Sequence, residues 1–122
     1  MFDDEILERL RARCPHYHEA SYAFILAALH YVLERLEEPR HISGRELAEG
    51  ARELAIERFG PMARTVLEFW GIHSTADFGE IVFALVECGI LIKQEGDTRA
   101  EFQDVFDFDS AFGGYRWGGT PG

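Results

Sequence analysis

Lysine is nearly absent from this chain of 122 residues: Lys93 is the only one, and the other eleven cations are arginines. Against 12 basic residues stand 22 acidic ones, so the formal net charge is −10 at pH 7. From residue 65 to residue 92 there is no Lys or Arg at all. Proteins that bind nucleic acid draw much of their affinity from cations placed on phosphates. We therefore do not expect nucleic acid as a partner.

Long hydrophobic runs and paired cysteines are also missing. No stretch reaches the roughly 18 apolar residues of a membrane-spanning helix, and the acidic start of the chain is unlike a secretory signal peptide. Cys14 and Cys88 are the only cysteines, and their spacing fits no zinc or redox motif. The length and the 47% hydrophobic content suit one packed domain. We expect a cytoplasmic protein with a single domain over residues 1–112, no membrane contact and no cofactor.

Five helices are predicted from apolar residues at three- and four-residue steps and from capping residues. Two of them form an N-terminal layer over residues 3–37, and three form a helix-turn-helix-like core over residues 43–89. The predicted ranges are 3–13, 19–37, 43–59, 61–70 and 75–88. The second helix is apolar almost all round, which predicts burial on every side or a face left for a second subunit.

A C-terminal β-hairpin is predicted over residues 90–108. It would consist of the aliphatic run 90–92, a turn at 95–97 and the roughly alternating aromatic and acidic residues of 102–108. Three capped helices followed by a hairpin is the element order of a winged helix-turn-helix. The predicted fold class is therefore mainly α (α+β), with about five helices and a winged-helix-like arrangement. The helix at 75–88 would then be the recognition helix, although it carries acids and no cation.

Five residues are candidates for contact with other proteins. Residues 113–122 contain five glycines and are predicted to form a flexible tail. Within this tail, Tyr115, Arg116 and Trp117 are of the types enriched at binding hot spots. Phe24 and Tyr31 lie on the apolar second helix, where a second copy of the chain is a further candidate partner.

The best metal candidates are Cys14, His16 and His18, because zinc accepts thiolate and imidazole ligands. The same pattern is explained by two loop histidines beside Pro15, and we favour that interpretation. No nucleophile lies next to a histidine and a carboxylate in a recognisable motif, so we predict neither a catalytic site nor a metal site.

Four segments carry a resemblance to a known family: residues 59–63, 70–72, 74–83 and 104–108. Through them the chain resembles a small uncharacterised bacterial family described as restricted mainly to planctomycetes and verrucomicrobia. The resemblance covers most of residues 16–112. It implies no activity, ligand or catalytic residue, because that family has no assigned function.

The predicted function is that of a non-enzymatic protein-interaction or regulatory module. One alternative is a winged-helix DNA-binding transcription regulator, and a second is a metal- or small-ligand-binding sensor. The DNA-binding alternative would depend on five arginines for its phosphate contacts: Arg40, Arg45, Arg52, Arg58 and Arg64.

Overall fold

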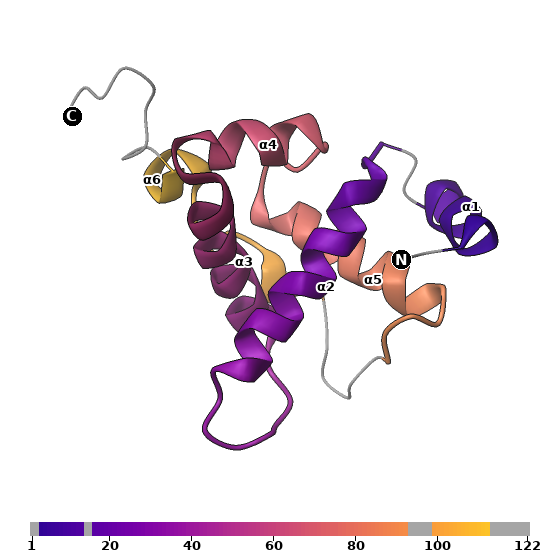
Figure 1. Cartoon of the computed structure of the whole chain (residues 1–122), viewed down its shortest axis with the longest axis horizontal. Coiled ribbons are helices and arrows are strands. Elements are labelled where there is room, and N and C mark those ends of the chain that lie inside the picture. Colours follow the sequence, from indigo (N-terminus) through magenta and orange to yellow (C-terminus); the bar gives the residue numbers. More distant parts are fainter. Residues whose placement is uncertain (1–2, 14–15, 93–98, 113–122) are drawn as a thin grey trace.

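The computed structural model describes residues 3–13, 16–92 and 99–112, and the regular structure of these residues is entirely helical (Figure 1). The elements in chain order are α1 (Asp4–Arg13), α2 (Glu19–Glu34), α3 (Gly44–Phe59), the 3₁₀ turn η1 (Gly60–Met62), α4 (Ala63–Phe69), α5 (Thr75–Glu87), the 3₁₀ turn η2 (Arg99–Phe102) and α6 (Phe108–Phe112). The five predicted helices are confirmed, and the fourth is divided into η1 and α4. Their ends differ from the prediction by at most three residues.

Local capping chemistry sets where the helices begin and end. At the start of α3, the Ser43 hydroxyl accepts from the backbone N–H of Glu46 at 3.1 Å, and the Glu46 carboxylate accepts from the Ser43 N–H at 2.9 Å. This reciprocal pair is the capping box that the sequence predicts. After α4 and α5 the chain turns at Gly71 and Gly89, whose φ angles are 95° and 78°. Glycine adopts this left-handed backbone without a steric penalty, so both helices end there.

The predicted β-hairpin is wrong, because no described residue belongs to a strand. The backbone N–H groups of Ile90 and Leu91 both donate to the carbonyl oxygen of Leu85, at 2.9 and 3.3 Å. These donors therefore close the C-terminus of α5, and they are not used for strand pairing. The predicted turn at 95–97 lies outside the described residues. With the hairpin, the α+β winged-helix-like fold class is also overturned.

In the second half of the predicted hairpin, buried side chains recur at every third residue. In a strand with one buried face they would recur at every second residue. The side chains buried in this region are those of Phe102, Val105, Phe108, Ala111 and Phe112. A strand would place alternate residues on one face, whereas a three-residue step suits turns and short helices. This segment accordingly forms η2, an irregular turn and α6.

The core lies where α2 meets α3 and α5. Tyr22 and Ile25 of α2 and Phe78, Ile81 and Leu85 of α5 are completely buried. The α2–α3 contact is close, because a Cβ atom added at Gly50 would lie 2.1 Å from Cγ2 of Val32. None of the helices in the described residues is long and apolar enough to cross a membrane.

Candidate functional site

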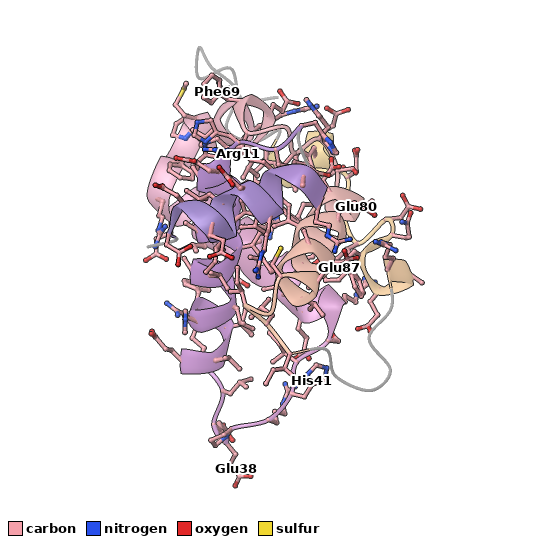
Figure 2. The ribbon with its side chains drawn as sticks, turned by 90° about the vertical axis from the view of Figure 1, so that its right-hand side faces the viewer. Arg11, Glu38, His41, Phe69, Glu80 and Glu87 are labelled. Carbon is pink, nitrogen blue, oxygen red and sulfur yellow. The ribbon has the colours of Figure 1, made fainter. Side chains whose placement is uncertain are left out.

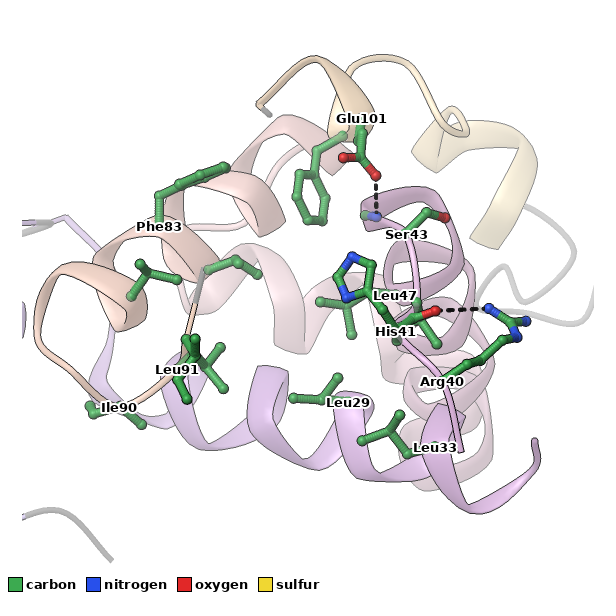
Figure 3. Close-up of a pocket in the computed structure, with 16 residues that line it drawn as sticks. Leu29, Leu33, Arg40, His41, Ser43, Leu47, Phe83, Ile90, Leu91 and Glu101 are labelled. Carbon is green, nitrogen blue, oxygen red and sulfur yellow. Dashed lines mark hydrogen bonds between the residues drawn. The ribbon is translucent and has the colours of Figure 1, made fainter. Parts of the chain in front are cut away.

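A pocket of about 520 Å³ opens between the C-terminal half of α2, the N-terminus of α3 and the C-terminal half of α5 (Figure 3). The α2–α3 connector, residues 90–92 and η2 complete its walls. The volume is in the range of pockets that bind ligands or partner side chains. Of the pockets found among the described residues, we take this one as the candidate site.

The walls are mainly apolar. Eleven of the sixteen lining residues carry apolar side chains: Leu29, Leu33, Ile42, Leu47, Val82, Phe83, Val86, Ile90, Leu91, Ile92 and Phe102. Two of them are exposed to solvent, Leu33 by 39% and Ile92 by 84%. The apolar excess of α2 therefore has a structural explanation: its N-terminal half lies in the core, and Leu29 and Leu33 of its C-terminal half face this pocket.

The polar residues gather at one end of the pocket, around the start of α3 (Figure 3). Arg40 donates to both carboxylate oxygens of Glu46, at 3.1 and 2.7 Å, and also to the carbonyl oxygen of His41, at 3.0 Å. The hydrogen bonds from Arg40 and from the Ser43 backbone lower the pKa of Glu46 to about 2. The same contact raises the pKa of Arg40 above its ordinary value. Both groups are therefore ionised at neutral pH, and their charges offset each other.

Two glycines give Phe102 its place in the pocket wall. A Cβ atom at Gly44 or at Gly79 would approach the Phe102 ring to 2.8 Å, so the ring fits a notch between α3 and α5 that only glycines leave open. The buried Thr75 hydroxyl donates to the Phe102 carbonyl oxygen at 2.6 Å and accepts from the Val105 N–H at 3.2 Å. These contacts hold η2 against the helices that form the pocket.

A second exposed apolar group lies at the opposite end of the molecule. Phe69 of α4 is 76% exposed and Met62 of η1 is 47% exposed. Figure 2 shows Phe69 at one end and His41, beside the pocket, near the other. Phe69 contacts the ring of His18, with the centroids 5.9 Å apart. Phe69 is not among the residues that line the candidate pocket.

The two interaction candidates on α2 lie in different environments. Phe24 is only 2% exposed, and its ring contacts those of Phe59 and Trp70 at centroid distances of 6.1 and 5.5 Å. Phe24 therefore belongs to the core. Tyr31 is half-buried, and the guanidinium of Arg35 lies 3.5 Å from the centre of its ring. The three interaction candidates of the tail lie outside the described residues: Tyr115, Arg116 and Trp117.

The two histidine candidates make local contacts in the described part of the chain. His18 is the N-cap of α2, and its Nδ1 atom accepts from the Ala20 N–H at 3.0 Å. His16 is exposed and lies against the ring of Tyr17, with centroids 4.1 Å apart. Within residues 3–13, 16–92 and 99–112, no three His, Cys, Asp or Glu side chains are grouped to hold a metal ion. Cys14 lies outside these residues.

Several features that the DNA-binding alternative needs take part in internal contacts. Arg40 pairs with Glu46, and Arg64 pairs with Glu68 at 3.0 Å and with Asp109. The helix at 75–88 places much of its surface in the core. The described residues also form no wing, so the winged-helix arrangement that this alternative assumes is absent from them.

Sequence reasoning missed the pocket itself. Its clearest signal is the aliphatic run 90–92 directly after a helix-ending glycine. That run is consistent with a strand, but it also places three large apolar side chains beside the end of α5. No protein-family model, curated protein or solved structure matches the chain. The candidate site is therefore argued from the geometry of this structure alone.

Proposed function

We propose that this chain is a non-enzymatic interaction module that binds an apolar segment of a partner protein in the pocket between α2, α3 and α5. The observation that carries the proposal is the pocket of about 520 Å³ with eleven apolar lining residues, two of which are exposed at its rim. Exposed apolar groups around a concave site favour binding, because filling the site removes their surface from water.

The polar end of the pocket supports binding over catalysis. Arg40 is held by Glu46, and the Glu101 carboxylate accepts from the Gly44 N–H at 2.7 Å. Catalysis by an activated nucleophile requires a base aimed at that nucleophile. The hydrogen bonds seen at this end instead fix the start of α3, which is a structural task.

The test is a selection of random displayed peptides of about 12 residues against the full chain, followed by affinity measurements on variants. The matched variants are Ile92→Asp at the pocket and Phe69→Asp on α4. Both positions are highly exposed and both changes add one negative charge, so neither variant should unfold and both alter the net charge equally.

We expect the selected peptides to share apolar side chains and to lose about tenfold or more in affinity for the Ile92→Asp chain, while the Phe69→Asp chain binds as before. Equal losses in the two variants, or no enriched peptide, would overturn the proposal. Binding of small apolar molecules that Ile92→Asp abolishes, without any peptide binding, would overturn it in favour of the sensor alternative.

A further inference from the structure

The end of α2 and the connector that follows it place negative charge close to the residues that line the pocket. Residues 34–39, which are the last residue of α2 and the first part of the connector, join Leu33 to Arg40, and both of these residues line the pocket. This short segment contains three exposed acids, Glu34, Glu37 and Glu38, and a single base, Arg35. Figure 2 shows Glu38 at the tip of the connector, at the same end of the molecule as His41.

The two nearby arginines offset this excess only in part. Arg35 donates to the Tyr31 carbonyl oxygen at 2.8 Å and stacks on the Tyr31 ring, where it lines a different pocket. The charge of Arg40 is matched by the bidentate contact with Glu46, whose pKa of about 2 keeps the carboxylate ionised. Residues 34–39, with three acids and one base, thus keep a net negative charge of two beside the apolar walls.

On α5, whose C-terminal half lines the pocket, two acids are each matched by an arginine. Glu80 pairs with Arg99 at 3.0 Å, and Glu87 pairs with Arg13 at 2.9 Å. Among the described residues, these two acids therefore add little charge near the pocket, and the net charge of −10 contributes a negative potential over a longer range.

We infer that the segment bound in the pocket is an amphipathic helix with lysine or arginine residues flanking its apolar face. This inference rests on the proposed function. The proposed function gives the bound segment its apolar face, and charge complementarity with the connector acids is the reason to expect basic residues beside that face. A groove between helices suits the i, i+3, i+4 and i+7 side chains of a docked helix. Basic flanks face the connector acids, whereas acidic flanks meet like charge.

The experiment uses three synthetic helical peptides with leucines at the same i, i+3, i+4 and i+7 positions. Their remaining positions are lysine, glutamine or glutamate, so the apolar face is constant and only the charge differs. Binding to the full chain is followed by calorimetry at low and at physiological salt. The protein variants are Ile92→Asp, Phe69→Asp, the connector triple change of Glu34, Glu37 and Glu38 to Gln, and a control triple change of the exposed Glu8, Glu53 and Glu57 to Gln.

We expect the lysine peptide to bind at least about tenfold more tightly than the glutamine peptide at low salt, and the glutamate peptide most weakly. The connector triple change removes most of this difference, while the control triple change, which removes the same net charge, leaves most of it. The advantage of lysine also shrinks as salt screens the charges.

The outcomes separate the inference from the function on which it rests. Equal binding of all three peptides that Ile92→Asp abolishes and Phe69→Asp preserves overturns the basic flanks and keeps the pocket as the binding site. Equal effects of the two triple changes show that only the net charge acts, which also overturns the inference. Lysine-peptide binding that Ile92→Asp and Phe69→Asp leave equally intact, or no binding of any peptide, overturns both proposals.

Discussion

The carboxylate of Glu101 accepts a hydrogen bond from the backbone N–H of Gly44 over 2.7 Å, although the two residues are 57 positions apart in the sequence. Gly44 begins α3, where backbone N–H groups have no partner within the helix. A carboxylate at this end of a helix is also favoured by the helix dipole. Glu101 therefore caps α3 from η2, and the adjacent Phe102 enters its notch in the pocket wall.

Replacing Glu101 by alanine removes this cap. We expect Glu101→Ala to lower the free energy of unfolding by about 1 kcal/mol, the usual cost of losing a capping side chain. Urea denaturation of this variant and of Gln103→Ala, an exposed neighbour, measures the difference. The capping role is refuted if Glu101→Ala is no less stable than Gln103→Ala.

Thr75 is the buried hydroxyl that joins α5 to η2. Thr75→Val keeps the shape of the side chain but leaves the Phe102 carbonyl and the Val105 N–H without this partner. Leaving buried polar groups unpaired costs about 1–3 kcal/mol, and we expect a loss of stability in that range. Thr65→Val on α4 is the control, because Thr65 is exposed. Equal unfolding midpoints for the two variants would show that the Thr75 hydroxyl contributes little.

The helices could be predicted from the sequence because their signals are local. Ser43 and Glu46 cap α3 as their spacing predicts, and Gly71 and Gly89 end α4 and α5. The missing hairpin has a tertiary cause. Phe102 is buried by a notch at Gly44 and Gly79, and no local pattern shows that these glycines face an aromatic ring.

The pocket could not be predicted for the same reason. Its walls come from α2, α3, α5 and η2, so it exists only where the packing of these elements leaves space. From the sequence alone, Leu33 and Ile92 would be assigned to the core because their side chains are apolar. Their exposure is decided by how the helices pack. Phe24 is the opposite case. The sequence suggests it as an interaction residue on the apolar helix α2, but the fold buries it in the core.

Gly50 permits the close contact between α2 and α3. Alanine in a helix interior is normally favoured over glycine by about 1 kcal/mol. At this position, however, the new Cβ atom would lie 2.1 Å from Cγ2 of Val32, so the helices or the valine must move. We expect Gly50→Ala to destabilise the protein by about 1–3 kcal/mol, as overpacking does.

The double variant tests the cause. Val32→Ala removes the clashing atom, so Gly50→Ala should cost less in that background than in the original chain, and thermal unfolding of the four chains gives the coupling. Strictly additive effects would mean that the two side chains do not compete for the same space.

Protonation of Glu46 should weaken the start of α3 only in strong acid. Its pKa is lowered from 4.5 to about 2, first by the hydrogen bond from Arg40 and then by that from the Ser43 backbone. A carboxyl group with a lower pKa in the folded state stabilises the fold above its unfolded pKa, and this contribution is lost as the pH falls through the folded value. Because the pair is partly exposed, we expect Glu46→Gln to cost no more than about 1 kcal/mol at pH 7.

The pH dependence of this variant separates the charge of Glu46 from its hydrogen-bonding oxygen. The difference in stability from the original chain should shrink between about pH 4.5 and pH 2. Urea denaturation at several pH values measures it, with Glu53→Gln, an exposed change on the same helix, as the control. A Glu46→Gln difference that stays constant from pH 7 to pH 2 would mean that the charge of Glu46 does not stabilise α3, because glutamine retains the side-chain oxygen but not the charge.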